Sequence, residues 1–349
     1  MHMSNDLDFG ALIPRKLART SIFRQPGWCV WDPCIVQGEE GTFHLFYSRW
    51  PTQLGFESWC THAEIAWATA TSASGPYEFR GIALPARGMN YWDGHSVYNT
   101  CVIRTGSKFY IYYTGNHGTD RWDPVRGISP FSEEWWCYRN HQRIGVAVAD
   151  SLYGPWQRFD KPLLDVSPDF GNTIIGVPNM VIKPDGGYRI YYKTLADGSG
   201  NFGGGVFHYS VDAPDPLGPF TRNPEPMVDK NRLLPGISEP FSFHIDDHFE
   251  WFQNERYWAI VKDHDAPFLT AYGRALLLFE SLDGRKWQPA RHVLVQDFAV
   301  IWEDNTREQF ERLEMPKLFF DYGRPAILSL AALAEGGSES FLLIIPLRT

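Results

Sequence analysis

The sequence has no run of five or more basic residues, and no run of apolar residues approaches 18 in length. Its formal net charge is −9. Nucleic-acid binding relies on a dense face of Lys and Arg side chains against the phosphates, and a membrane-spanning helix needs about 20 consecutive apolar residues. We therefore expect neither a nucleic-acid partner nor a membrane partner, and a neutral or acidic ligand that is held by local groups.

Cysteine is scarce and lies only in the first 140 residues. The five residues, Cys29, Cys34, Cys60, Cys101 and Cys137, are odd in number and show no Cys-x-x-Cys spacing. This pattern argues against a disulfide framework and against a zinc site. We expect mostly buried thiols, no metal-ligating residues and no required cofactor.

The N-terminus lacks the apolar core of a secretion signal. We expect a bacterial cytoplasmic or periplasmic protein, and the sequence leaves the choice between these compartments open. The first 10 residues are expected to be flexible.

Aromatic and turn-forming residues are abundant. The chain of 349 residues contains 14 Trp, 16 Tyr and 24 Phe together with 31 Gly and 25 Pro. This mixture is typical of many short strands joined by tight turns.

A short block recurs five times, 60 to 80 residues apart. Each copy has a polar residue, often a Pro, a hydrophobic strand, a turn and a second strand. The copies begin at Asp32-Pro33, Asn99-Thr100, Asn179-Met180, Glu239-Pro240 and Glu314-Met315. In the fourth copy, Asp246-Asp247 takes the place of the turn.

A second block follows each of the first four copies and contains a strand, a Gly turn and an aromatic strand, as in residues 143–159. The two blocks together describe a four-stranded blade, and blades become stable when they stack around an axis. We therefore predict an all-β fold, a single five-bladed β-propeller over residues 1–349. The last blade lacks one strand, which we expect from the N-terminus near residues 11–22 to close the ring.

The first strand of each blade lines the channel of a propeller, so equivalent residues converge on one axial pocket. The five positions are Asp32, Asn99, Asn179, Glu239 and Glu314. As capping or turn residues each would be unremarkable. As a ring, they form a polar site with convergent carboxyl groups.

Two carboxyl groups across a sugar-sized gap are the requirement for glycoside hydrolysis. Blades one and four are not neighbours in a five-membered ring, so we predict Glu239 as the acid and Asp32 as the base. A separation of about 6.5–9.5 Å corresponds to inversion and about 5 Å to retention, and we expect inversion. Glu314 is a third candidate catalytic carboxylate that raises the pKa of the acid or holds a cation, and Arg312 is able to neutralise it.

These motifs resemble the clan of five-bladed propeller hydrolases that includes glycoside hydrolase families 43 and 117. Asp32-Pro33 matches the blade-one Asp of family 43, and Glu239-Pro240 resembles its later Glu followed by Gly-Pro. The middle-blade Asp of that family has no match, because the corresponding positions are Asn99 and Asn179.

Several stretches are similar to family 117, which releases 3,6-anhydro-L-galactose from agar oligosaccharides. They are residues 91–97, 144–151 and 201–204. The His that family 117 places before its blade-four Glu corresponds to Ser238 here, so the resemblance carries over Glu239 and not the His.

Other residues are expected at the rim of the pocket. Asp93 is a further candidate catalytic carboxylate and His95 a substrate contact, although both are equally compatible with a solvated loop. The candidate substrate-binding residues are Trp31, Trp92, His95, Asn99, Asn179, Arg312 and Lys262, since aromatic faces stack on sugar rings and the polar groups bind hydroxyls. The long insertion from 117 to 141 is expected to form part of a pocket lid or a subunit contact in a homodimer.

The function that follows is an exo-acting glycoside hydrolase that removes a terminal sugar, such as anhydro-galactose or arabinofuranose, from an algal or plant oligosaccharide. A glycoside phosphorylase would need a cationic cluster beside the acid to hold phosphate. The Asn residues at the middle-Asp positions favour a non-catalytic sugar-binding propeller. A channel Ca²⁺ held by carboxylates is compatible with the sequence, although no ligand spacing requires it.

Overall fold

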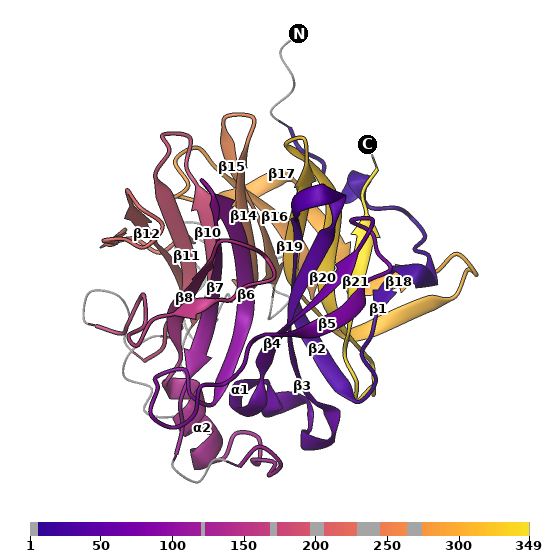
Figure 1. The fold of residues 1–349 in the computed structure, drawn as a ribbon. Coiled ribbons are helices and arrows are strands. Elements are labelled where there is room, and N and C mark those ends of the chain that lie inside the picture. The colour runs from indigo at the N-terminus through magenta and orange to yellow at the C-terminus, as the bar shows by residue number, and fades with distance from the viewer. Residues whose placement is uncertain are drawn as a thin grey trace, which may run out of the picture.

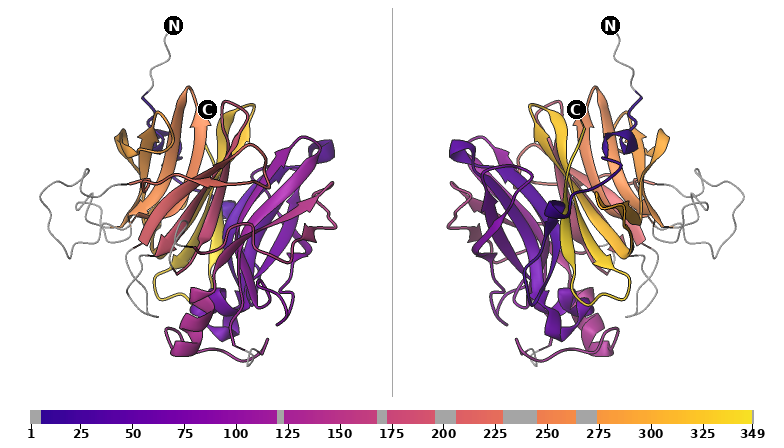
Figure 2. Two further views of the ribbon diagram at one scale, coloured as in Figure 1. Left: turned by 90° about the vertical axis from the view of Figure 1, so that its left-hand side faces the viewer. Right: turned by 90° about the vertical axis from the view of Figure 1, so that its right-hand side faces the viewer.

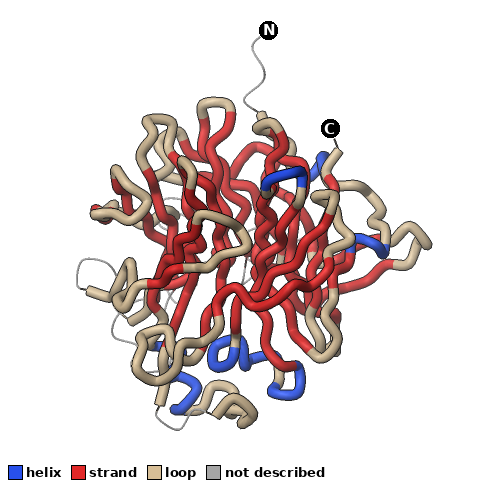
Figure 3. Tube along the Cα trace, viewed as in Figure 1, coloured by secondary structure: helices blue, strands red, loops and turns tan. Residues whose placement is uncertain are grey.

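A computed structural model describes residues 6–119, 123–167, 173–195, 206–228, 245–263 and 274–348. Its strands form five antiparallel sheets that surround a common axis (Figure 1). The prediction of a five-bladed β-propeller is therefore confirmed. Strands make up most of the trace in Figure 3, and the helical segments lie outside the sheets.

Four blades have four consecutive strands each, running from the channel outward. Blade one contains β2 (Trp28–Gln37), β3 (Phe43–Pro51), β4 (Glu64–Ala70) and β5 (Glu78–Leu84). Blade two contains β6 (Ser96–Thr105), β7 (Lys108–Asn116), β8 (Arg143–Ala149) and β9 (Gln157–Arg158). Blade three contains β10 (Gly176–Ile182), β11 (Tyr188–Leu195), β12 (Val206–Ala213) and β13 (Thr221–Arg222). Blade four contains β14 (Ile245–Gln253), β15 (Arg256–Asp263), β16 (Ala275–Ser281) and β17 (Gln288–Asp297).

The fifth blade combines both ends of the chain. Its strands are β18 (Ala299–Ile301), β19 (Arg307–Asp321), β20 (Arg324–Ala334), β21 (Phe341–Pro346) and β1 (Ile22–Phe23). Ile22 pairs with Leu343, and Phe23 pairs with Leu342. The N-terminal strand therefore closes the ring as predicted.

Helical segments are short and lie mainly before or between the strands. Two α-helices, α1 (Trp59–His62) and α2 (Glu133–Asn140), lie together at one end of the propeller, and the termini lie at the other end (Figure 1). The 3₁₀ turns are Gly10–Leu12, Arg19–Ser21, Glu39–Gly41, Thr52–Leu54 and Phe56–Ser58. None of the helices in the described ranges is long and apolar enough to cross a membrane.

The core is divided among the contacts between neighbouring blades, which fan around the axis in the side views of Figure 2. One apolar cluster, for example, joins Leu278 of blade four to Leu328 and Leu343 of blade five, and another joins Phe46 of blade one to Ile111 of blade two. A blade alone would expose these faces to water, so their burial stabilises the ring as a whole.

Phe9 is fully buried in the first of these clusters, with its ring 5.9 Å from that of Trp251. Asp6 also forms an ion pair with Arg291 at 2.9 Å. The expectation of a flexible N-terminus is therefore wrong for residues 6–10. Burial of the cysteines, by contrast, is as expected, because four of the five are buried and all five are free thiols.

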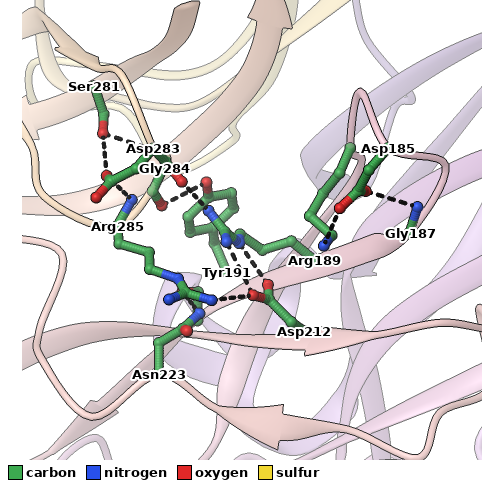
Figure 4. A network of polar contacts seen from close by, with 12 residues as sticks. Asp185, Gly187, Arg189, Tyr191, Asp212, Asn223, Ser281, Asp283, Gly284 and Arg285 are labelled. Carbon is green, nitrogen blue, oxygen red and sulfur yellow. Dashed lines mark hydrogen bonds and ion pairs between the residues drawn. The ribbon is translucent and has the colours of Figure 1, made fainter.

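A polar network joins blades three and four at their outer edge (Figure 4). Arg189 of β11 donates two hydrogen bonds to the Asp212 carboxylate, at 2.6 and 2.9 Å. It also donates to the carbonyl oxygen of Asp283, in the turn between β16 and β17, at 2.8 Å. Arg285 of the same turn reaches Asp212 at 2.9 Å. The bidentate pair fixes the turn of one blade against the strands of the next.

Candidate active site

The innermost strand of every blade carries a β-bulge at the same level. In each bulge two residues oppose one residue of the next strand, and the first of the two has a positive φ of 46–56°. The bulge pairs are Asp32-Pro33, Asn99-Thr100, Val177-Pro178, Asp247-His248 and Met315-Pro316. Positive φ is costly for residues other than Gly and is held by the surrounding structure, often at functional sites.

These bulges surround one axial pocket, because the first residue of each of the five pairs lines it. The cavity has a volume of about 150 Å³. Its wall is completed by α1, α2 and the segment before α1, which contribute Glu57, Trp59 and Arg139. The pocket thus opens into the end of the propeller at which the two helices lie (Figure 1).

Asp32 is held rigidly in the blade-one bulge. Its carboxylate accepts hydrogen bonds from Ser48 Oγ at 2.6 Å, Asn99 N at 2.9 Å and Asn99 Nδ2 at 3.0 Å. Burial raises the pKa of Asp32, whereas the donors from Ser48 and Asn99 oppose that rise by stabilising the ionised form. Asn99 therefore fixes Asp32 across the boundary between blades one and two.

The opposite wall holds three carboxylates and two ammonium groups. Lys262 Nζ of β15 lies 2.5 Å from Asp247 Oδ2 and 2.7 Å from Glu314 Oε1. Lys193 Nζ of β11 lies 2.7 and 2.8 Å from the two oxygens of Asp246. Three blades thus contribute to one buried cluster of charge, which we call the acidic wall: Lys193, Asp246, Asp247, Lys262 and Glu314.

The acidic wall separates the protonation of its carboxyl groups. Burial raises the pKa of Asp247 to about 7 against the charge of Lys262, and repulsion by Asp246 and Glu314 adds to the rise. Burial also acts on Asp246, but Lys193 and Lys262 outweigh it and bring its pKa well below the ordinary value. Lys262 likewise outweighs burial at Glu314 and lowers its pKa. Asp247 is therefore the carboxyl group of the wall that carries a proton near neutral pH.

The sequence alignment of the blades was correct for Asp32 and Asn99 and displaced in the other three blades. The bulge residue of blade three is Val177, and the alignment placed Asn179 there. The side chain of Asn179 instead donates to Glu250 Oε2 at 2.9 Å, below the pocket lining. In blade five the bulge begins at Met315, one residue after Glu314, which still lines the pocket.

Blade four differs most from the expectation. Asp246-Asp247 was assigned to the turn, but both residues lie in the inner strand β14, and the turn is at Asn254-Glu255. Glu239 lies outside the described residues. The recurrence of Pro178 and Pro316 after the bulge position was the signal that could have aligned blades three and five with Asp32-Pro33.

Asp93, His95 and Trp92 were expected at the rim, and none of them is among the residues that line the pocket. Asp93 is fully buried and binds Arg87 at 2.6 Å, Arg158 at 3.3 Å and the Tyr113 hydroxyl at 2.7 Å.

Trp92 stacks on Tyr113, and a Cβ added at Gly145 would come within 2.6 Å of its ring. His95 Nδ1 accepts from Gly118 N at 2.7 Å. The structure therefore places all three residues in the packing of blade two, because the segment before β6 folds inward against that blade.

Arg312, Lys262 and Trp31 do line the pocket, as expected. Arg312 Nη2 binds Glu57 at 2.9 Å, and its guanidinium lies 4.7 Å from the Phe56 ring centroid. Sequence reasoning did not find several other lining residues, because they come from second strands and from the helical segments: Trp50, Phe56, Glu57, Trp59, Tyr98, Arg139, Gln142 and Lys193.

The residues do not fit the expected channel Ca²⁺. Within the described ranges, no group of three or more His, Cys, Asp or Glu side chains is arranged to hold a metal ion. Lys262 and Lys193 occupy the positions among the carboxylates at which a cation would bind. Further acidic ligands would have to displace these ion pairs.

Comparison with protein-family models finds no match, and comparison with curated protein sequences finds no significant match. Solved structures do match. One is a complex of BT0996 with RGII, at 12% identity and a TM-score of 0.65, in which the match covers 97% of this protein and 92% of BT0996.

A second is Zg3597, a family 117 glycoside hydrolase of the marine bacterium Zobellia galactanivorans, at 17% identity and a TM-score of 0.59, with 96% and 89% covered. A third is a thermostable family-43 glycoside hydrolase, at 11% identity and a TM-score of 0.55, with 94% and 96% covered. The expected resemblance is confirmed at the level of the fold: this chain is a five-bladed β-propeller of the kind found in glycoside hydrolases of families 43 and 117.

Proposed function

We propose that this chain is an exo-acting glycoside hydrolase in which Asp32 is the general base and Asp247 is the general acid. The observation that carries the proposal is the pair of equivalent bulges in blades one and four, which present two carboxyl groups of different protonation to one axial pocket. Pairs of carboxyl groups whose environments push their pKa values apart are characteristic of glycosidase acid and base residues.

Each carboxyl group has the environment that its role needs. The acid must hold a proton for the leaving oxygen near neutral pH, and the pKa of Asp247 is about 7. The base must be ionised to activate water, and the three hydrogen bonds to Asp32 favour its ionised form. Glu239, the acid that the sequence favours, is the alternative for that role and lies outside the described residues.

The shape of the site supports a terminal sugar as the substrate. The cavity of about 150 Å³ ends on the channel axis, which favours a single sugar unit over the middle of a chain. Trp31 and Trp59 offer aromatic faces to such a unit. The terminal sugar is anhydro-galactose, arabinofuranose or a related unit of an algal or plant oligosaccharide. Because Asp32 and Asp247 come from blades that are not neighbours, we propose inversion through a water between them.

The test is release of monosaccharide from agar, carrageenan, porphyran, ulvan and arabinan oligosaccharides by wild type, Asp32→Asn, Asp247→Asn and Glu239→Gln. We expect the Asp32 and Asp247 variants to lose about 10²–10⁴-fold in kcat, with Glu239→Gln active. Asp150→Asn is the matched control, since the Asp150 side chain is 84% exposed.

Full activity in Asp247→Asn together with loss in Glu239→Gln would overturn the assignment of the acid. Absence of release by the wild type on every substrate, with binding retained, would overturn the hydrolase itself. NMR of the first anomer released from an active substrate decides between inversion and retention.

A further inference from the structure

Most cationic side chains in the axial pocket are neutralised by a neighbouring carboxylate. Lys193 binds Asp246, and Lys262 binds Asp247 and Glu314. Arg312 binds Glu57 at 2.9 Å. These pairs leave little net charge at the acidic wall for a ligand to meet.

Arg139 is the exception in the part of the chain that the structure describes. It lies on α2, is half-buried and lines the pocket, and no carboxylate forms an ion pair with it. Its Nη1 donates one hydrogen bond, to the side-chain oxygen of Gln142. A guanidinium has five N–H donors, so most of its donors stay available to a ligand.

The guanidinium is positioned by buried groups. Gln142, which is 3% exposed, donates through Nε2 to the Tyr98 hydroxyl at 2.5 Å. Asn116 donates to the same hydroxyl at 3.3 Å. Trp59 packs beside Arg139, with 5.7 Å between the guanidinium carbon and the ring centroid. A series of three buried polar side chains thus holds one edge of the Arg139 fork and restricts its motion.

A fixed guanidinium without a carboxylate partner is complementary to a planar or tetrahedral oxyanion, because its parallel N–H groups match two oxygens of a carboxylate or sulfate. The need for a local cation is plain, since the chain has a formal net charge of −9 and would otherwise repel an acidic ligand.

We propose that Arg139 selects substrates whose sugar in the axial pocket carries an anionic substituent, either a carboxylate or a sulfate ester. This rests on the proposed glycosidase function for its biological meaning, but the binding that it predicts does not depend on turnover. The acid and base act on the glycosidic bond, whereas Arg139 binds the substituent.

The experiment compares matched ligands. Calorimetry measures binding of uronate oligosaccharides against their methyl esters, and of sulfated galactan oligosaccharides against their desulfated forms. The proteins are wild type, Arg139→Gln, Arg139→Lys and the control Arg126→Gln. Arg126 precedes α2, is paired with Glu134 and does not line the pocket. Melting temperatures confirm that each variant is folded.

For one of the two ligand pairs, we expect wild type and Arg126→Gln to prefer the anionic member by about 10- to 100-fold, as a charge-assisted bidentate contact provides. Arg139→Gln should lose that preference and keep its affinity for the neutral member, and Arg139→Lys should keep only part of it. The pair that shows the preference identifies the substituent.

Equal binding of both members of both pairs by wild type would overturn the proposal, as would an unchanged preference in Arg139→Gln. Sugar release that requires inorganic phosphate and is lost in Arg139→Gln would assign Arg139 to phosphate and also overturn it. Anionic preference without any sugar release would leave this proposal standing while the hydrolase proposal fails, so the two failures are distinguishable.

Discussion

Replacing Lys262 by Met should unmask the repulsion within the acidic wall. Lys262 is 2% exposed, and its ammonium lies 2.5 Å from Asp247, 2.7 Å from Glu314 and 4.0 Å from Asp246. Met has a similar length and no charge, so the variant removes the cation with little change in packing. Three buried carboxyl groups would then share only the ammonium of Lys193, which binds Asp246.

The cost follows from burial and from proton linkage. Removing one partner of a buried ion pair costs about 3–5 kcal/mol of unfolding free energy. In the variant the folded-state pKa values of Asp247 and Glu314 rise above their unfolded values, so the native state binds more protons than the unfolded state. Stability then falls as pH increases, by about 1.36 kcal/mol per pH unit for each extra proton held. One such proton between pH 5 and 8 amounts to about 4 kcal/mol.

The assay is urea unfolding of wild type and Lys262→Met at pH 5 and pH 8. We expect a small loss of stability at pH 5, where the carboxyl groups are protonated, and a loss of about 3–5 kcal/mol at pH 8. Lys108→Met is the control, because Lys108 forms an exposed pair with Asp150 and should show no pH-dependent loss. An equal loss of stability at both pH values would refute the coupling of these carboxyl groups.

Three further outcomes follow from the contacts. Ser48→Ala removes a 2.6 Å hydrogen bond that favours ionised Asp32, so its pKa should rise and the acidic limb of the activity–pH profile should move to higher pH. In the wild type, activity should decline as pH rises through about 7, where Asp247 loses its proton, and a flat profile from pH 6 to 9 would contradict its role as acid. Phe23→Ala should lower the unfolding free energy by about 3–5 kcal/mol in denaturant titrations, because the ring packs on Tyr47 at 5.1 Å in the closing strand.

The architecture could be predicted from the sequence because blades repeat. Each copy has alternating apolar residues and a turn at similar spacing, and a repeat that cannot bury its own faces must stack on its neighbours. The same logic predicted the missing strand of the last blade, which β1 supplies. The position of Asp32 was predictable as well, since the Pro that follows it marks the bulge.

The register at the axis was harder to predict. A β-bulge adds one residue to a strand, and a shift of one residue turns side chains to the other face. This is why Asn179 lies beneath the pocket while Val177 lines it. In blade four the polar pair Asp246-Asp247 has the composition of a turn, and only its pairing with β15 shows that it belongs to a strand.

The sequence by itself determined the number of blades, the closing segment and one wall of the pocket, because these depend on local pattern and repetition. The tertiary structure decided which charges meet. Lys193, Asp247 and Glu314 come from three blades, and Arg139 comes from a helix between strands of a fourth. Their protonation and pairing depend on distances and on burial, which arise only when the ring closes and no local pattern encodes.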